Sequence, residues 1–525
     1  MSRFLDERIR EWARVAPDNP AVGSPSEWIT YGELDAHIAR VAASLRGRGV
    51  GPGDSVLNLL PAGVASVVAG FAIQRAGACL VEVNRDNGAD FLVKIAHATK
   101  ARHAFVQPRD LATLDAPALS WRAVWVPGAP ASIRQPGNVE TLVGFTLDRQ
   151  AEAPVVDADA GPPRSLDQVA LVLFTSASSG EPRGVRLTCR NIAANAESIV
   201  EYLQLTPADR VMSILPLSYS YGRSLLNTHM WCGGSILFDH RFMYPRVVLE
   251  AIGSQRCTGF AGVPLTFELL HRKCDPRTVP MPSLRYVTVA GGGLATEMRR
   301  WVRDAFAPAQ FFVMYGQTEA TARLAYLPPD RFDDKPDSIG IAIPAVELRV
   351  VDDEGRDVGV NEVGNLVARG ENVSPGYLDA PEETRDILRD GWLWTGDLAR
   401  RDADGYFFHV GRKRLMLKVA GYRFAPEEVE GRLKEHTSVA EACVVGAPDE
   451  LAGEAVWAFV VLAAPVDDAA LRRHCAEKLP AYKVPRRIVR LDELPKSSAG
   501  KLRRAELQQM AHRLAEAPAD CVREA

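Results

Sequence analysis

The chain has 525 residues, which is too long for one hydrophobic core and predicts at least two domains. Its apolar fraction of 47% and charged fraction of 24% are those of an ordinary globular protein. A net charge of −4 gives no reason to expect nucleic acid or an anionic membrane as a partner. Eight cysteines without a Cys-x-x-Cys pair, and a charged N-terminus without an apolar signal core, favour a cytoplasmic protein without structural zinc.

Helix and strand patterns alternate through the middle of the chain. A linker rich in Ala, Asp, Gly and Pro is expected at 151–164, before an apolar strand that begins near Leu171. Thr188 is placed to cap a helix, because apolar residues follow it at helical spacing. Farther on, we expect strands at 286–290 and 311–314 and a helix at 295–306. This βαβ pattern predicts an α/β architecture, in which ligands bind at the carboxyl ends of strands.

The pattern changes near Gly411. We expect helices at 426–436 and 467–479 and strands at 439–445, 455–462 and 488–491. About a hundred residues of this kind make a small α+β domain. The prediction is therefore an N-terminal domain at 1–410, a hinge at 411–414 and a C-terminal domain at 415–525.

Residues 171–185 are the most informative segment. They read Leu-Val-Leu-Phe-Thr-Ser-Ala-Ser-Ser-Gly-Glu-Pro-Arg-Gly-Val, an apolar run followed by a hydroxyl-rich loop and a cation. Backbone N–H groups, hydroxyls and a guanidinium gathered in one loop suit the phosphates of a nucleotide. Taken alone, a Ser/Gly loop more often only turns the chain. The residues that we assign to phosphate binding are Thr175, Ser176, Ser178, Ser179, Gly180 and Arg183.

Further motifs follow this loop in a fixed order. They are Tyr315-Gly-Gln-Thr-Glu319, Gly364–Gly370, Gly376-Tyr377, Trp394–Asp397, Gly411-Arg412, Lys418–Arg423 and Pro495–Lys501. In this order they resemble the AMP-forming adenylating enzymes, a superfamily of acyl-CoA synthetases, peptide-synthetase adenylation domains and luciferases. The resemblance covers nearly the whole chain. It implies an α/β fold with a large N-terminal domain of several subdomains and a small, mobile α+β C-terminal domain.

The resemblance also implies roles for the residues that match. Tyr315 would stack on adenine beside Gly316, and the turn Gly291, Gly292 and Gly293 would let the backbone approach the base and the acyl chain. Thr318 would hydrogen-bond the α-phosphate. Glu319 would hold Mg²⁺, which suits a carboxylate combined with phosphate oxygens.

Five residues nearer the C-terminus receive roles in the same way. Asp397 and Arg412 would bind the ribose, and Lys501 would bridge the attacking carboxylate and the α-phosphate, offsetting the repulsion between two anions. The C-terminal domain would turn at Arg414 after adenylation and bring the acceptor loop at Gly421 to the site. Without the other motifs, Asp397 could simply close a turn, and Lys501 could belong to a solvated basic patch with Arg503 and Arg504.

The chain departs from the family at the phosphate loop. Ala177, Ser179 and Arg183 stand where the family usually has Gly, Thr and Lys. Arg keeps the charge but changes the hydrogen-bond geometry. These changes leave open an ATP-binding pseudoenzyme, although retention of Glu319, Asp397 and Lys501 together argues against it.

The segment Leu215–Gly222 matches the family's acid-pocket motif, with Tyr219 where many acyl-CoA ligases have His. An α-amino acid is an unfavourable substrate, because no Asp lies between Leu215 and Trp231 to pair with a buried ammonium. Residues 258–264 indicate an apolar or aromatic cavity, although a plain core position is an equal alternative. The residues that we assign to the acid are Tyr219, Gly222, Phe260 and Gly262.

Three strings, at 224–229, 242–245 and 258–264, resemble ligases of bacterial biosynthetic clusters, among them acyl-CoA ligase-like proteins and coronafacic acid ligase, an amide synthetase. The implied function is an ATP- and Mg²⁺-dependent ligase that adenylates a hydrophobic or aromatic carboxylic acid. The acceptor is a thiol, of CoA or a phosphopantetheinyl carrier protein, or an amino-acid amine. Adenylation of a group other than a carboxylate, such as nitrite, stays open. We expect a monomer or homodimer.

Overall fold

The computed structural model describes residues 2–84, 89–110, 121–127, 140–145, 164–176, 182–419, 422–449, 453–496 and 502–516. The chain folds into two compact units. The first is formed by Met1–Leu348 and Ala368–Trp394, and the second by Arg349–Val367 and Thr395–Ala525. The predicted hinge at 411–414 lies within the second unit, and the predicted domain limits stay a prediction.

Two sheets form the frame of the first unit. The nine-stranded sheet has the order β16-β15-β14-β13-β12-β10-β11-β1-β2, with parallel pairs from β14 to β1 and antiparallel pairs at both edges. Its strands are β1 (Pro20–Ser24), β2 (Glu27–Thr30), β10 (Arg210–Ser213), β11 (Ser235–Phe238), β12 (Gly259–Gly262), β13 (Tyr286–Val289), β14 (Gln310–Tyr315), β15 (Ala325–Leu327) and β16 (Ile341–Ala342). The strands predicted at 286–290 and 311–314 are thereby confirmed.

The second sheet is also mainly parallel, because only its edge strand β9 runs antiparallel to its neighbour. Its order is β7-β6-β5-β3-β4-β8-β9. The strands are β3 (Ser55–Asn58), β4 (Cys79–Glu82), β5 (His103–Phe105), β6 (Ala123–Pro127), β7 (Glu140–Phe145), β8 (Val169–Ser176) and β9 (Pro182–Thr188). The apolar run of the phosphate-loop segment is therefore a strand, and the linker predicted at 151–164 lies almost wholly outside the described residues.

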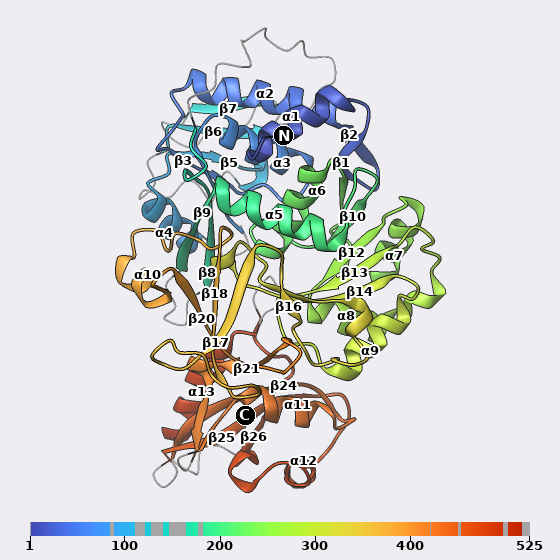
Figure 1. Cartoon of the computed structure of the whole chain (residues 1–525), viewed down its shortest axis with the longest axis vertical. Helices are drawn as coiled ribbons and strands as arrows, with labels where there is room; N and C mark the ends of the chain where they lie inside the picture. The colour runs from blue at the N-terminus through green and yellow to red at the C-terminus, as the bar shows by residue number, and fades with distance from the viewer. Residues whose placement is uncertain are drawn as a thin grey trace. The chain divides into compact units, whose positions relative to one another are not determined.

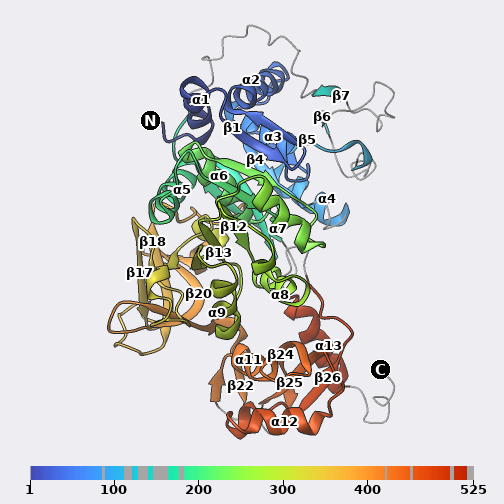
Figure 2. The same ribbon diagram turned by 90° about the vertical axis from the view of Figure 1, so that its right-hand side faces the viewer.

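Helices cover the faces of both sheets. They are α1 (Leu5–Val15), α2 (Tyr31–Gly47), α3 (Val64–Arg75), α4 (Ala89–Thr99), α5 (Cys189–Leu203), α6 (Ser220–Cys232), α7 (Pro245–Ser254), α8 (Pro264–Lys273), α9 (Thr296–Ala305) and α10 (Pro381–Ile387). Thr188 caps α5 as predicted, because its side chain accepts from the Asn191 N–H and the Asn191 side chain accepts in return. In Figures 1 and 2, α7, α8 and α9 lie on one side of the nine-stranded sheet, and α5 and α6 lie on the other.

The main core lies between the two sheets. Alternate residues of neighbouring strands point to opposite faces. Val211 of β10 and Leu80 of β4 join the central core with α2, α3, α5 and α6, whereas Val81 of β4 packs against the α4 face. Every residue of α6 is buried, and its polar side chains find partners inside the protein: Arg223 pairs with Glu82 at 3.0 Å.

A third sheet has the order β17-β18-β20-β19, with β21 beside β20. Its strands are β17 (Val346–Val351), β18 (Gly364–Gly370), β19 (Leu388–Arg389), β20 (Trp392–Arg401) and β21 (Phe407–Arg412). A fourth sheet, in the second unit, has the order β23-β22-β25-β24, with β26 beside β25. Its strands are β22 (Leu417–Val419), β23 (Tyr422–Phe424), β24 (Val439–Asp449), β25 (Gly453–Leu462) and β26 (Arg487–Arg490).

Three helices pack on the fourth sheet: α11 (Pro426–Lys434), α12 (Asp468–Ala476) and α13 (Arg504–Glu516). Residues of β24 alternate between them, since Val444 joins the core of α11 and α12 while Cys443 and Val445 join the core of α13. The elements predicted after residue 426 are thereby confirmed, and so is the α/β fold class with a large and a small part. Among the described helices, none combines the length and apolar character that crossing a bilayer demands.

Candidate active site

The motifs of the first unit gather at one edge of the nine-stranded sheet. Strands β10, β12, β13 and β14 are parallel neighbours, so their carboxyl ends lie together. The segments that follow them are the acid-pocket motif, Val263, the Gly291–Gly293 turn and the Tyr315–Glu319 motif. The strands predicted before the Gly291–Gly293 turn and the Tyr315–Glu319 motif are confirmed as β13 and β14. The parallel order of the strands explains why segments far apart in the sequence lie together.

The chain folds back tightly after β14. Leu324 N donates to Tyr315 O at 2.9 Å, and Ala322 N donates to Gln317 O at 3.1 Å. Gly316 must lack a side chain here, because a Cβ at this position would lie 2.0 Å from Ala322 O. Thr318 and Glu319 therefore lie in a short 3-10 turn, η4 (Thr318–Ala320), whose place relative to the strand is fixed.

Asn372 holds the rest of this loop. Thr321 and Ala322 have φ angles of 56° and 100°, which residues with a Cβ rarely adopt. The buried Asn372 donates from Nδ2 to Ala320 O at 3.2 Å and to Arg323 O at 2.9 Å, and its main-chain oxygen accepts from Thr321 Oγ1 at 2.6 Å. Strained backbone of this kind persists where its surroundings over-determine it, and it is frequent at functional sites.

Glu319 is oriented by Tyr377, whose hydroxyl donates to Glu319 Oε1 at 2.7 Å. Tyr377 is 6% exposed, and burial together with the nearby Glu319 charge raises its pKa, so the hydroxyl stays protonated. The segment around Gly376 lies against β9, since Leu378 N donates to Gly184 O at 2.7 Å. The Gly376-Tyr377 motif is thus a support for the Glu319 carboxylate.

The strands on either side of the phosphate loop are described, whereas its tip is not. Thr175 and Arg183 are cross-strand partners in β8 and β9, and the Arg183 guanidinium lies 5.5 Å from the centre of the Tyr377 ring. This arrangement brings the loop's cation to the tyrosine that holds Glu319. Outside the described residues lie Ser178, Ser179, Gly180 and the Ser176 side chain, so all loop assignments stay predictions.

The acid-pocket motif contacts the nucleotide motif directly. Thr318 Oγ1 donates to Ser220 Oγ at 3.1 Å, at the first residue of α6. Tyr219 precedes it, and its ring lies edge-on to that of Tyr221 with 6.3 Å between the ring centres. Burial raises the pKa of Tyr219 to about 12, so its hydroxyl remains a neutral donor at pH 7.

Gly291 is the member of the glycine turn that faces Tyr219. Its φ is +89°, and a Cβ would lie 2.0 Å from the Tyr219 hydroxyl oxygen. Gly293 has nothing within 4 Å of its Cβ position, and Gly292 meets only the Pro264 ring at 3.3 Å. The exposed turn therefore needs glycine chiefly at its first position.

Three of the residues assigned to the acid have packing roles. Phe260 is fully buried, and its ring lies 6.2 Å from Phe267 and 6.0 Å from Phe306, in the aromatic core under α8 and α9. A Cβ at Gly262 would meet Thr266 at 2.8 Å, and one at Gly222 would meet Pro216 O at 2.4 Å. Close packing accounts for these three residue types, and their contact with substrate stays a prediction.

The residues assigned to ribose belong to the second unit. Asp397 on β20 and Arg412 on β21 are cross-strand partners, with Arg412 Nε 3.2 Å from Asp397 Oδ1 and His409 Nε2 3.6 Å from the same oxygen. Asp397 is 3% exposed, and its N–H donates to Thr395 Oγ1 at 3.1 Å. Asp397 therefore belongs to a paired strand and does not simply close a turn.

Lys501 and Gly421 lie outside the described residues, so their roles stay predictions. Arg414 lies in η6 (Lys413–Leu415), where its neighbour Lys413 donates to Asn365 Oδ1 at 3.0 Å. Arg504 is mostly buried and forms an ion pair with Glu430, and Arg503 pairs with Glu506 at 3.0 Å. The alternative prediction, a solvated basic patch that includes Arg504, is therefore wrong for this residue.

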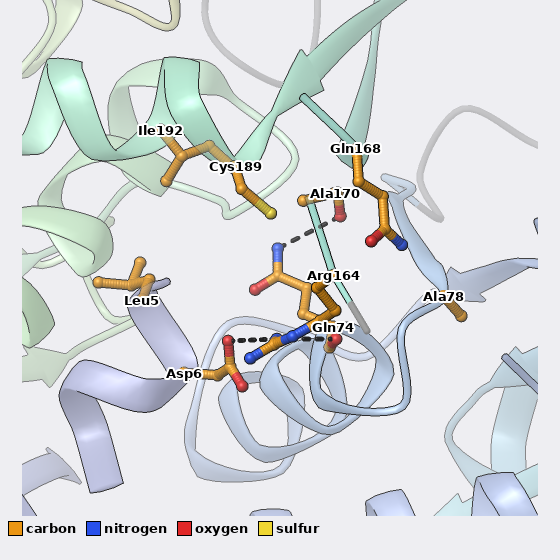
Figure 3. Close-up of a pocket in the computed structure, with 9 residues that line it drawn as sticks. All are labelled: Leu5, Asp6, Gln74, Ala78, Arg164, Gln168, Ala170, Cys189 and Ile192. Carbon is orange, nitrogen blue, oxygen red and sulfur yellow. Dashed lines mark hydrogen bonds and ion pairs between the residues drawn. The ribbon is translucent and has the colours of Figure 1, made fainter. Parts of the chain in front are cut away.

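The cavity drawn in Figure 3 is not this site. It lies under α1 and is crossed by an ion pair between Arg164 and Asp6 at 2.8 Å and by a hydrogen bond from Gln74 to Ala170 O at 3.3 Å. Its volume of about 20 Å³ holds one water and no nucleotide. None of the motif residues that the structure describes lines it.

The chain belongs to the AMP-binding enzyme family. The family's main model matches residues 9–378, and the model of its C-terminal domain matches residues 428–501. A feruloyl-CoA synthase from Amycolatopsis sp. is 30% identical over 505 residues, covering 94% of this chain and 96% of that protein.

Solved structures give the same result. Anthranilate CoA ligase AuaEII in complex with anthranoyl-AMP has a TM-score of 0.85 at 26% identity and covers 98% and 99% of the two chains. The amide bond synthetase McbA from Marinactinospora thermotolerans has a TM-score of 0.84 at 26% identity and covers 96% and 99%. The o-succinylbenzoate CoA synthetase MenE from Bacillus subtilis, in complex with ATP and a magnesium ion, has a TM-score of 0.81 at 25% identity and covers 96% and 99%. The protein is an ATP-dependent, AMP-forming acid ligase that activates an acid and transfers it to a thiol or an amine.

Proposed function

We propose that this ligase adenylates an aromatic carboxylic acid at the start of α6 and passes the acyl group to CoA. The observation that carries this proposal is the 3.1 Å hydrogen bond from Thr318 to Ser220, because it joins the nucleotide motif to the acid motif. Tyr219 and Tyr221 flank Ser220 in the sequence; Tyr221 is buried, and the partly buried Tyr219 ring offers aromatic surface beside Ser220. An acid placed against the Tyr219 ring would have its carboxylate next to the α-phosphate that Thr318 would bind.

In the first half-reaction, a carboxylate oxygen attacks the α-phosphorus of ATP, the bond to the pyrophosphate oxygen breaks, and an acyl-adenylate forms. The rate depends on alignment of two anions and on stabilisation of the charge that develops at the phosphorus. Thr318 would donate to the α-phosphate, and Tyr315 would stack on adenine. Lys501 would bridge the carboxylate and the phosphate, and Asp397 would accept from the ribose hydroxyls.

The donor set around Glu319 fits Mg²⁺. Glu319 Oε1 accepts from Tyr377, and its other oxygen takes no hydrogen bond from the residues that the structure describes. No group of three or more His, Cys, Asp or Glu side chains within the described ranges forms a metal cluster. Mg²⁺ is commonly held by one or two carboxylates together with substrate phosphates, which is what a lone Glu319 beside ATP supplies. When bound, the ion would neutralise the charge of the leaving pyrophosphate.

In the second half-reaction, a nucleophile attacks the acyl carbon and AMP leaves. CoA is the proposed acceptor because the curated relative reported above is a CoA ligase. An amino-acid amine is the second candidate, and it is favoured by the equal structural likeness to an amide bond synthetase. The cytoplasmic location and the monomer or homodimer expected from the sequence remain part of this proposal.

Product analysis tests the proposal. Purified protein is incubated with ATP, Mg²⁺ and a panel of aromatic and aliphatic acids, with CoA in one arm and mixed amino acids in the other, and products are identified by mass spectrometry. Thioesters of aromatic acids in the CoA arm alone are expected. Amides without thioesters would replace CoA by an amine, and ATP binding without AMP in either arm would point to a pseudoenzyme.

Lys501 is tested in the same assay. Replacement Lys501→Ala should suppress pyrophosphate release far more than acyl transfer from a preformed acyl-adenylate, because the bridge acts only in the first half-reaction. Equal loss of both half-reactions would contradict the role assigned to Lys501.

A further inference from the structure

Among the described residues of the first unit, Arg223 and Arg323 have the most deeply buried arginine side chains, and they differ in their acidic partners. Arg223 and Arg323 are each 2% exposed. Arg223 Nη1 lies 3.0 Å from Glu82 Oε1, and its Nε donates to Asn227 Oδ1 at 3.2 Å. No carboxylate of the described residues lies within 4 Å of the Arg323 guanidinium, and Arg323 Nε has no hydrogen-bond partner among them.

Tyrosines surround Arg323. Its guanidinium carbon lies 4.8 Å from the centre of the Tyr221 ring, and the Tyr202 hydroxyl accepts a hydrogen bond from the guanidinium. Tyr202 in turn donates to Met314 Sδ at 3.1 Å, which leaves its oxygen as the acceptor. Burial raises the pKa values of Tyr202 and Tyr221, so both rings are neutral at pH 7 and supply no counter-charge.

The aromatic faces stabilise this cation only in part. A cation over a ring gains electrostatic energy, but less than it loses when it leaves water. A buried charge is therefore normally paired or bound to a ligand of opposite charge. Glu82 meets this requirement for Arg223, and no protein group that the structure describes meets it for Arg323.

Hydrogen bonds hold the main chain of Arg323 in the loop that follows β14 and contains Thr318 and Glu319. Its carbonyl oxygen accepts from Asn372 Nδ2 at 2.9 Å and from Asn195 Nδ2 at 3.3 Å. The guanidinium lies over the ring of Tyr221, the residue after Ser220, which accepts from Thr318. Arg323 is thus next to the start of α6 and on a backbone that hydrogen bonds hold in place, as a specificity-determining group requires.

We propose that Arg323 binds a second oxyanion of the substrate acid, a carboxylate or sulfonate carried away from the reacting carboxylate. This inference rests on the proposed function and narrows its substrate to aromatic acids with a second negative group. The planar guanidinium fork matches both groups, because each presents two oxygens for parallel hydrogen bonds. The reacting carboxylate is not the group expected there, since pairing with a buried cation would hold it away from the α-phosphate and lower its nucleophilicity.

Matched acids test the proposal. Pyrophosphate release is measured with benzoate, isophthalate, terephthalate, 3-sulfobenzoate and the monomethyl ester of isophthalate, in wild type and in Arg323→Met and Arg323→Lys. Wild type should prefer at least one dianionic acid to benzoate. In Arg323→Met, the ratio of kcat/KM for that acid to kcat/KM for benzoate should fall about 10- to 100-fold, as expected for loss of charge-assisted hydrogen bonds.

The two variants also distinguish a substrate-binding role of Arg323 from a purely structural one. Arg323→Lys keeps the charge without the fork and should lie between wild type and Arg323→Met, with the loss mainly in KM. It also serves as the test if Arg323→Met does not fold, which is judged by its thermal unfolding. An equal fall for all acids, or no preference of wild type for any dianionic acid, would overturn the proposal and leave Arg323 with a structural role.

Failure of the proposed function would look different. If no acid gave AMP, the adenylation proposal itself would be contradicted, and calorimetric titration of wild type and Arg323→Lys with isophthalate and 3-sulfobenzoate would still examine the subsite. Binding to wild type that weakens in Arg323→Lys supports it. Absence of binding to wild type contradicts it.

Discussion

The Tyr377 hydroxyl donates to the Glu319 carboxylate across 2.7 Å, and this bond joins segments that are 58 positions apart in the sequence. Tyr377 lies against β9, which carries Arg183, and Glu319 lies after β14 in the other sheet. The bond therefore couples the phosphate-loop hairpin to the loop that would bind the α-phosphate and Mg²⁺. A carboxylate fixed in this way needs no reorientation when nucleotide arrives.

Removing this hydroxyl should impair the use of Mg²⁺. In Tyr377→Phe, Glu319 loses the donor that orients it, while the ring under Arg183 remains. We expect kcat/KM for MgATP to fall about tenfold, the effect of one hydrogen bond to a charged group. Pyrophosphate release measured against Mg²⁺ concentration should shift to higher Mg²⁺. An unchanged Mg²⁺ dependence would contradict the role assigned to this pair.

Gly291 and Tyr219 should behave as a coupled pair. Gly291→Ala places a Cβ 2.0 Å from the Tyr219 hydroxyl and 3.2 Å from the ring carbon that bears it, at a φ of +89°. We expect at least a roughly tenfold loss in kcat/KM for the acid, since the tyrosine must move. Tyr219→Phe removes the atom in conflict, so the double variant should lose less than the product of the two single losses. Strictly multiplicative losses would show that the two residues act independently.

Asp397 should matter for nucleotide and not for acid. Its carboxylate is 3% exposed and pairs with the mostly exposed Arg412. Asp397→Asn removes the charged acceptor proposed for the ribose hydroxyls, so KM for ATP should rise roughly 10- to 100-fold, as expected for charge-assisted hydrogen bonds, with KM for the acid little changed. Arg412→Gln is the matched comparison and should show a smaller rise. Equal rises in both KM values would contradict the ribose assignment.

His229 predicts how stability depends on pH. It is 1% exposed, and burial lowers its pKa to about 4, below the value of about 6.5 that is usual for the unfolded chain. Its Nδ1 lies 2.8 Å from Leu225 O and its Nε2 lies 3.1 Å from the Tyr286 hydroxyl, an arrangement that a neutral ring satisfies by donating from Nδ1 and accepting at Nε2. Between pH 6.5 and 4 the unfolded state therefore binds the extra proton.

The contribution of His229 to the free energy of unfolding should be complete above pH 6.5 and should be lost as the pH falls toward 4. For a pKa shift of this size, the loss amounts to at most about 3 kcal/mol. Urea unfolding at pH 7 and pH 5 measures it. The His229→Gln variant should be less stable than wild type at pH 7 and should lose less stability on acidification. Parallel pH profiles for the two proteins would contradict this assignment.

The predicted elements with clear periodicity were confirmed, because burial of one face leaves its mark on the order of residues. The Thr188 cap with its helix and the α11–β24–β25 arrangement are examples. Phe260 shows the limit of such patterns. Its sequence neighbourhood suits both a pocket and a core, and only the contacts with Phe267 and Phe306 place the ring in the core under α8.

The roles of three residues, Tyr377, Asn372 and Arg323, are indicated by the sequence to unequal degrees. Tyr377 belongs to a motif that the sequence shows, but its partner lies 58 positions away and no spacing predicts that contact. Asn372 and Arg323 lie in no motif, and nothing local marks either as buried. Their roles come from hydrogen bonds and missing counter-charges, which are properties of the folded neighbourhood.

The family, the chemistry of adenylation and most motif residues can be predicted from the amino-acid sequence, because that chemistry requires particular residue types in a fixed order along the chain. The tertiary structure decided which of them touch. Parallel strands brought the ends of β10, β12, β13 and β14 to one edge, and packing placed Thr318 against Ser220 and the neutral rings of Tyr221 in α6 and Tyr202 in α5 beside Arg323. Contacts of this kind arise from packing between distant segments, so the order of residues along the chain does not contain them in a readable form.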